Sequence, residues 1–202
     1  MTATYLQTLF TPTVINAQEQ NGSRSAYARL AETAEDTAPP DPIGPREIAF
    51  IAQRDSFYMA SNSESGWPYL QHRGGPPGFV KAVGNGAVAF ADFLGNRQYI
   101  SVGNLSHDDR VSLFFMDYPN RARLKILGRA RTTDDPDLVA KLEDPAYRAR
   151  VERAVVISVQ AFDWNCPKHI TARFTQADIA QAVAPLHARI ADLEAELAAT
   201  IR

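Results

Sequence analysis

The strongest constraint in this sequence is a series of short strand-like runs between Ser56 and Trp164, each ending at a turn signal. Runs rich in Val, Ile, Phe and Tyr are typical of β-strands. Asn85-Gly86 favours a tight hairpin turn, and Pro119-Asn120 separates two longer runs. Short joins of this kind connect antiparallel strands, because parallel strands need long crossovers. We therefore predict a mainly β (α+β) fold: an antiparallel β-barrel of six or more strands with peripheral helices.

The same punctuation places the elements along the chain. We expect strands over 56–61, 67–73, 79–83, 87–93, 110–118, 122–133 and 153–164. Helices are predicted after Pro12 with an interruption at Asn21-Gly22, from Pro45, over 96–107, after an N-cap at Asp135, and after Thr175 and Asp178. This divides the chain into an N-terminal arm with a Pro-rich linker (1–44), the barrel (45–175) and a C-terminal helix (176–202).

Apolar residues of the C-terminal segment are spaced 4, 3, 4, 3 and 4 apart, which is a heptad pattern. They are Ile179, Val183, Leu186, Ile190, Leu193 and Leu197. Pro185 either breaks the first turns or restarts the helix. Two interpretations remain open at this stage: the helix packs on its own barrel, or it pairs with another subunit.

Charge and cysteine content exclude several classes of function. The net charge of −2 argues against broad nucleic-acid binding, which needs a basic surface. Cys166 is the single cysteine, so no intramolecular disulfide exists, and we predict an inert thiol. No basic-then-apolar leader and no apolar run of about 18 residues occurs, so we expect a soluble cytoplasmic protein.

Two apparent motifs do not indicate a metal site or a dinucleotide-binding site. The four histidines form no metal-binding signature, and we predict no metal site. Gly84–Ala89 matches the pattern G-x-G-x-x-A, but it lies between two strands. A dinucleotide fingerprint needs a helix after it, so a tight turn explains these glycines better.

Arg97 is the strongest local candidate for a binding residue. It follows a strand and Gly95, at the expected start of a short helix. Helix-start N–H groups together with an arginine suit a phosphate, and Ser101 and Asn104 would add polar groups along the same helix. The competing interpretation is a solvent-facing start capped by Asn96.

A second polar pair lies in the strand over 67–73. Side chains alternate between the two faces of a strand, so Gln71 and Arg73 share one face while Leu70 and His72 share the other. The first pair is predicted to border a ligand groove.

Three segments together resemble the pyridoxamine 5′-phosphate oxidase-like family of FMN-binding split barrels, and in particular its bacterial FMN-binding relatives. They are FTPTVINAQEQNGSR (10–24), GNRQYISVGNL (95–105) and DWNCPKHI (163–170). The strand order from Pro45 to Thr175 also resembles that family. The resemblance implies a split barrel that works as a homodimer, with FMN in grooves between the subunits.

The resemblance also implies roles for individual residues. Asn96, Arg97 and Gln98 match positions that hold the FMN phosphate in the oxidases, although Gln98 replaces a lysine. Gln71, His72 and Arg73 match a strand at the flavin edge. Trp164 would form a wall of the flavin site or pack in the core. The complete predicted cofactor-binding set is Gln71, His72, Arg73, Asn96, Arg97, Gln98, Ser101, Asn104, Trp164, Lys168 and His169, the last two from the neighbouring subunit.

The expected function is an FMN-dependent oxidoreductase with an unknown small-molecule substrate and an electron donor such as NAD(P)H. No catalytic side chain stands out, since the flavin carries the redox chemistry. We expect no nucleic-acid or membrane partner. The alternatives are a flavin carrier or redox sensor without turnover, and a split barrel that binds haem or a deazaflavin.

Overall fold

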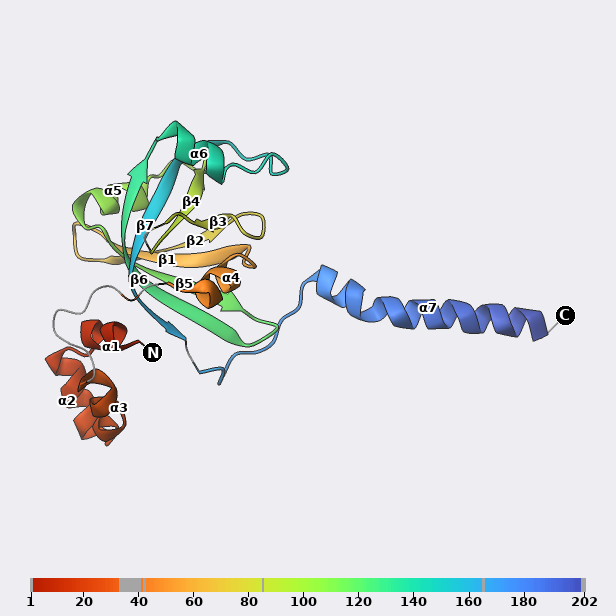
Figure 1. The fold of residues 1–202 in the computed structure, drawn as a ribbon, viewed down its shortest axis with the longest axis horizontal. Helices are drawn as coiled ribbons and strands as arrows, with labels where there is room; N and C mark the ends of the chain where they lie inside the picture. Colours follow the sequence, from red (N-terminus) through yellow and green to blue (C-terminus); the bar gives the residue numbers. More distant parts are fainter. Residues whose placement is uncertain (1, 33–40, 42, 85, 165, 201–202) are drawn as a thin grey trace. The chain divides into compact units, whose positions relative to one another are not determined.

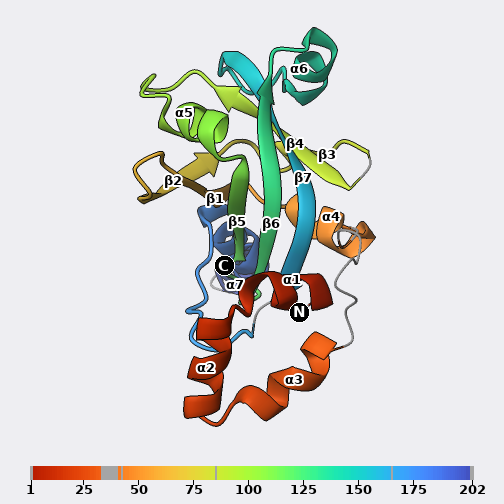
Figure 2. The same ribbon diagram turned by 90° about the vertical axis from the view of Figure 1, so that its left-hand side faces the viewer.

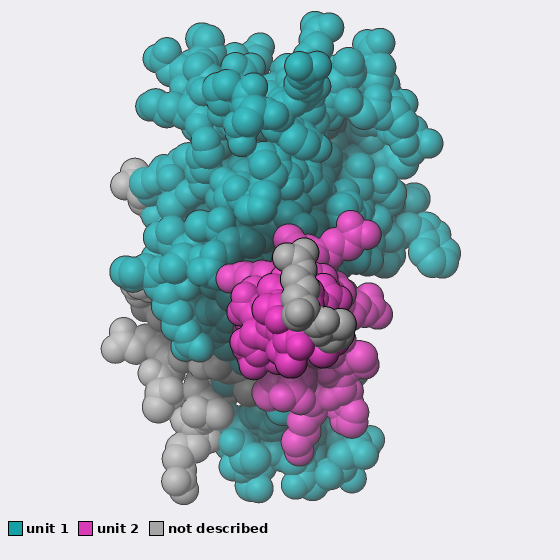
Figure 3. Space-filling view, turned by 90° about the vertical axis from the view of Figure 1, so that its right-hand side faces the viewer, with its two compact units in different colours: residues 1–116, 123–166 teal, residues 117–122, 167–202 magenta. Residues whose placement is uncertain are grey.

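The structure is a computed structural model that describes residues 2–32, 41, 43–84, 86–164 and 166–200. The chain divides into two compact units (Figure 3). Unit 1 comprises Met1–Met116 and Arg123–Cys166, and unit 2 comprises Asp117–Ala122 and Pro167–Arg202. The hairpin Asn85-Gly86 lies partly outside the described residues, because Asn85 is one of the gaps.

One seven-stranded sheet forms the centre of the fold (Figure 1). Its order is β2-β1-β5-β6-β7-β4-β3, and every strand pair whose register the structure describes is antiparallel. This confirms the predicted antiparallel β fold with six or more strands. The strands are β1 (Ser56–Asn62), β2 (Pro68–Gly74), β3 (Val80–Ala82), β4 (Ala87–Phe93), β5 (Arg110–Asp117), β6 (Ala122–Thr133) and β7 (Val151–Trp164).

The sheet curls so that strands from its two ends share a core. Phe57 of β1 lies 5.2 Å from Phe90 of β4 between ring centroids, although three strands separate β1 and β4 in the order. Phe79 and Phe115 stack on the same ring at 5.8 and 4.9 Å. All four rings are buried. Such curling is how a sheet becomes a barrel, and Figure 2 shows β5, β6 and β7 as long neighbouring strands of it.

A tight loop joins the two edge strands of the sheet. The chain passes from β2 to β3 through Gly75 and Phe79, and a Cβ atom on Gly75 would lie 2.6 Å from Phe79 Cγ. Only glycine therefore lets the phenylalanine ring fold back into the core at this point.

Seven helices accompany the sheet in the described part of the chain. Asn21 ends α2 as predicted, and the Asp135 side chain accepts a hydrogen bond from Asp137 N at 3.0 Å at the start of α6. The helices are α1 (Ala3–Leu9), α2 (Pro12–Gln20), α3 (Arg24–Glu32), α4 (Pro45–Ile51), α5 (Ile100–His107), α6 (Pro136–Leu142) and α7 (Gln176–Thr200).

The short helix predicted over 96–107 begins later than expected. α5 starts at Ile100, and its N-cap is Tyr99 rather than Asn96. Arg97 and Tyr99 have φ angles of 59° and 52°, a left-handed backbone that cannot belong to a right-handed helix. The expectation that Arg97 starts the helix is therefore wrong, and Arg97 lies in the loop before it.

The N-terminal arm contains a helix that the sequence did not predict. α1 buries Leu6 to 1% exposure and Tyr5 to 6%. The Thr2 hydroxyl donates to the carbonyl of Phe162 in β7 at 2.8 Å. The first residues of the arm therefore pack on the barrel as part of unit 1.

Unit 2 contains α7, a helix of 25 residues that continues through Pro185. Thr175 and Asp178 begin it as expected, with Thr175 N and Oγ1 both donating to Asp178 Oδ2 at 2.8 Å. None of the helices in the described part of the chain has the length and apolar character needed to cross a membrane.

Candidate functional site

A pocket of about 240 Å³ opens in unit 1 beside the loop that precedes α5. It contains polar side chains from three strands and the whole loop. Its walls are Tyr69, Gln71 and Arg73 of β2, Asp92 and Phe93 of β4, Glu152 of β7, and the segment from Gly95 to Val102.

The β2 wall follows directly from strand alternation. Tyr69, Gln71 and Arg73 are alternate residues and therefore share one face, which is the face toward the pocket. The Ser101 hydroxyl donates to Gln71 Oε1 at 2.8 Å, and Ser101 is 3% exposed. This hydrogen bond ties β2 to the first turn of α5, so the two walls hold a fixed spacing.

An ion pair forms the floor of the pocket. Arg73 Nη1 donates to Asp92 Oδ1 at 2.7 Å, and the Arg73 and Asp92 side chains are 15% and 8% exposed. Arg153 Nε lies 3.6 Å from the other oxygen of Asp92. One buried carboxylate thus faces two guanidinium groups. Two guanidinium groups against one carboxylate give this corner an excess positive charge, which favours an anionic ligand nearby.

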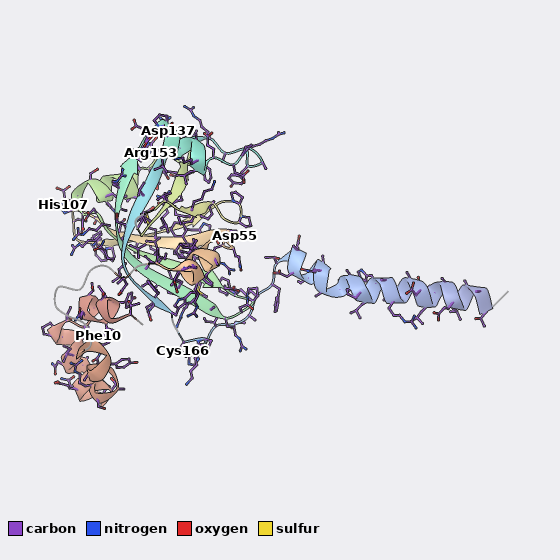
Figure 4. All side chains as sticks on the ribbon, viewed as in Figure 1. Phe10, Asp55, His107, Asp137, Arg153 and Cys166 are labelled. Atoms are coloured by element: carbon purple, nitrogen blue, oxygen red, sulfur yellow. The ribbon has the colours of Figure 1, made fainter. Side chains whose placement is uncertain are left out.

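A β-bulge brings a second carboxylate to the pocket. Asp92 pairs with Arg153, but the next residue of β4, Phe93, pairs with Val151. Glu152 is therefore the extra residue of β7 and has no partner in the register. Bulges of this kind redirect a side chain, and Glu152 lines the pocket. Arg153 extends from the same strand (Figure 4).

The loop before α5 is held by a chain of hydrogen bonds. Arg97 Nε donates to the Tyr99 hydroxyl at 3.2 Å, and that hydroxyl donates to Glu152 Oε1 at 3.0 Å. The bond to Tyr99 and the charge of Glu152 raise the pKa of Arg97 above its ordinary value, so the group stays cationic. Left-handed backbone at two non-glycine residues costs free energy and is concentrated at functional sites.

The first turn of α5 faces the same pocket without a side-chain cap. Its N-cap, Tyr99, makes no capping hydrogen bond with its side chain, and Ile100, Ser101 and Val102 all line the pocket. The N–H groups of a first helical turn have no partner inside the helix. Together with the helix dipole they favour an anion.

Five of the predicted binding residues are not among those that line this pocket. His72 is on the opposite face of β2, where its ring packs edge-on against Tyr58 at 5.6 Å. Asn104 is buried and donates to Ser61 Oγ at 3.0 Å. Lys168 and His169 are exposed residues of unit 2, and no contact tests their predicted role in binding a flavin.

Trp164, the fifth, packs against α4. Its indole Nε1 donates to Glu47 Oε1 at 2.7 Å, and its ring meets Phe50 edge-on at 4.7 Å. Within unit 1, Trp164 therefore has a packing role, which is the alternative to its predicted role as a wall of the flavin site. The other six predicted residues, Gln71, Arg73, Asn96, Arg97, Gln98 and Ser101, line the pocket together.

Several residues that line the pocket were not predicted from the sequence. Tyr69 follows the same alternation as Gln71 and Arg73, and Asp92 is a carboxylate within an otherwise apolar strand. A buried carboxylate needs a partner, so both residues had a readable signal. Glu152 had none, because its place depends on a bulge that only the folded pairing of β4 with β7 reveals.

Comparison with known protein families gives one match. The family model for pyridoxamine 5′-phosphate oxidase matches residues 45–169. No curated protein matches the chain significantly.

Several solved structures are similar to this chain at low sequence identity. Group A Streptococcus HupZ matches at 10% identity and a TM-score of 0.50, covering 65% of this chain and 100% of HupZ. An FMN-binding protein from Syntrophomonas wolfei subsp. wolfei matches at 8% and 0.47, covering 73% and 97%. A Clostridium acetobutylicum protein related to general stress protein 26, of the pyridoxinephosphate oxidase family, matches at 14% and 0.43, covering 65% and 92%.

Proposed function

Because the chain belongs to the pyridoxamine 5′-phosphate oxidase family, we propose that it is an FMN-binding, homodimeric oxidoreductase of the cytoplasm that acts on a small molecule. The observation that carries the proposal is the meeting of three anion-binding features in one pocket. These are Arg97, the corner where Arg73 and Arg153 face the single carboxylate of Asp92, and the uncapped first turn of α5.

The phosphate of FMN suits the loop end of this pocket. Arg97 supplies a cationic donor there, Gln98 adds a neutral amide, and the N–H groups of Ile100 to Val102 add the positive end of a helix. The carboxylates of Asp92 and Glu152 already neutralise part of the positive charge in the pocket. Backbone donors therefore take over the role of the lysine that Gln98 replaces.

The size of the pocket supports a site shared between two subunits. A volume of about 240 Å³ is below the roughly 300–1,000 Å³ of sites that enclose a whole drug-sized ligand. One chain would hold the phosphate and part of the sugar chain. A second copy would then complete the walls around the ring.

When bound, FMN would supply the acceptance and release of a hydride or of single electrons. The protein's part is binding and electrostatics. Arg73 is kept in place by Asp92 and carries a fixed positive charge next to β2. Such a charge stabilises negative charge on a neighbouring ligand in a site partly shielded from water.

The direct test is spectroscopic. The purified chain should carry a flavin absorption spectrum, and the released compound should have the mass of FMN. A preparation without flavin should take up FMN on titration, with one site per chain. A colourless protein that binds no FMN would overturn the proposal, and a Soret band instead would indicate haem.

Turnover is a separate question with its own experiment. Anaerobic addition of NAD(P)H should bleach the flavin absorption, and a suitable acceptor should restore it. A protein that binds FMN but is reduced by no donor would be a flavin carrier or sensor. Uptake of a deazaflavin in preference to FMN would identify the other alternative.

A further inference from the structure

α7 presents an apolar seam along one side. The seam consists of Ile179, Val183, Leu186, Ile190, Leu193 and Leu197. Its five largest side chains are 46–62% exposed. The helix itself is well supported, since nine of its 25 residues are alanine and it starts with the Thr175–Asp178 capping pair. A contiguous row of exposed branched side chains on a stable helix marks a surface that another protein covers.

The residue types at the core positions of the seam indicate how many helices pack together and in which direction. Counting heptads, the first core position (a) holds Val183, Ile190 and Leu197, and the second (d) holds Ile179, Leu186 and Leu193. β-branched residues at a with leucine at d favour a parallel two-stranded coiled coil, and the four inner positions from Val183 to Leu193 follow this rule. Pro185 falls at the outer c position, so its ring stays out of the seam.

The charges beside the seam agree with a second copy of the same helix. Arg189 occupies a g position and Glu194 occupies an e position, five residues further on. In a parallel, in-register pair, each g residue faces the e residue of the partner's next heptad. Arg189 would thus face Glu194 of the other chain, and the two-fold symmetry makes this contact twice. Within one helix Arg189 lies 3.6 Å from the exposed Glu196, a weak pair that leaves it free to turn.

We propose that α7 pairs with α7 of a second copy of this chain as a parallel, in-register, two-stranded coiled coil. The inference rests on α7 alone and does not depend on the proposed flavin. It gives the chain a second self-association surface, separate from the barrel unit that carries the pocket.

Cysteine cross-linking tests both the pairing and its direction. In full-length protein carrying Cys166→Ser, Leu186→Cys and Leu197→Cys are made separately, with Ala188→Cys at an outer f position as the matched control. Under mild oxidation we expect most of each seam variant to become a covalent dimer on a non-reducing gel, and the control to stay near background. These substitutions lie on an exposed helix, so folding is preserved.

The alternatives give different results. An antiparallel pair that overlaps the whole seam places Leu197 opposite Ile179, about 27 Å along the axis from its own copy. Leu197→Cys alone would then not cross-link, but a mixture of it with Ile179→Cys would, and the parallel arrangement would be wrong. If no variant or mixture cross-links above the control, α7 does not pair with itself at all. Both outcomes are independent of whether the preparation binds FMN.

A charge exchange checks the register. Arg189→Glu should slow cross-linking of Leu197→Cys several-fold, because two glutamates then face each other. Adding Glu194→Arg should restore the rate. If the double exchange is as slow as the single one, Arg189 does not face Glu194 and the proposed register is wrong.

Discussion

Arg73 and Asp92 form a 2.7 Å ion pair between β2, an edge strand of the sheet, and β4, the strand next to the other edge. The pair can exist only because the sheet curls round and brings its two ends together. The same contact forms the floor of the pocket. Barrel closure and the floor of the pocket therefore depend on the same two side chains.

Removing the buried acid should destabilise the fold. Asp92→Ala leaves the Arg73 guanidinium without this partner, and the Arg73 side chain is only 15% exposed. We expect a loss of about 2–3 kcal/mol in the free energy of unfolding, somewhat below a fully buried pair because Arg73 keeps some contact with water. Urea titration followed by tryptophan fluorescence measures it.

The chain offers a matched control with similar geometry and different burial. Arg129 Nη1 and Asp109 Oδ1 are 2.6 Å apart, but their side chains are 57% and 45% exposed. Asp109→Ala should therefore cost less than about 1 kcal/mol. If both variants lose the same free energy of unfolding, burial does not increase the contribution of the Arg73–Asp92 ion pair to stability.

Phe57 should be among the most sensitive core positions. It is 1% exposed and contacts three other aromatic rings that come from different parts of the barrel. Phe57→Ala should cost about 3–5 kcal/mol, since it removes these contacts and leaves a cavity. Trp67→Ala, at a residue 76% exposed, should change the free energy of unfolding by less than about 0.5 kcal/mol. A similar effect at both sites would contradict the proposed core.

Most of the fold could be predicted from the sequence because its signals are local. Strand alternation over 67–73 identified the face that lines the pocket, and the Asp135 cap identified α6. The loop before α5 could not be predicted in the same way. A positive φ at Arg97 and Tyr99 is a cost that local preference argues against. It persists because Tyr99 binds Glu152, a residue 53 positions away.

The candidate site was predicted less completely than the fold for a related reason. The sequence predicts polar residues that follow a strand or helix period. It does not predict those whose position depends on how distant strands pair. His72 was included by resemblance although its strand position directs it away from the pocket. Asn104 was included by helical spacing, but Ser61 holds it in the interior.

Arg97 should contribute strongly to FMN affinity. Its guanidinium lines the pocket, and a charge-assisted hydrogen bond to phosphate would be lost in Arg97→Ala. We expect FMN binding to weaken by about tenfold to a hundredfold in fluorescence titration. Arg110→Ala is the matched control, because Arg110 is an exposed arginine paired with Asp108 outside the pocket. Unchanged affinity for Arg97→Ala would remove the phosphate assignment.

Glu152 should oppose the binding of an anion. Its carboxylate lines the pocket, so Glu152→Gln removes a negative charge while leaving an amide oxygen to accept from Tyr99. We expect FMN to bind about threefold to tenfold more tightly at low salt, with a smaller gain at high salt. Glu64→Gln, in the exposed turn between β1 and β2, should have no effect. Weaker binding in Glu152→Gln would show that the carboxylate orders the loop more than it repels the ligand.

The start of α7 should depend on pH through Asp178. Hydrogen bonds from the Thr175 backbone and hydroxyl lower the pKa of Asp178 below its ordinary value. A lowered pKa in the folded state means that the cap stabilises the helix above the ordinary pKa of about 3.9 and is lost as pH falls further. The amide resonance of Thr175 in NMR spectra should therefore titrate with a midpoint below about 3.9. Asp178→Asn should abolish this titration, whereas a midpoint at or above the ordinary value would show that the capping pair does not persist in solution.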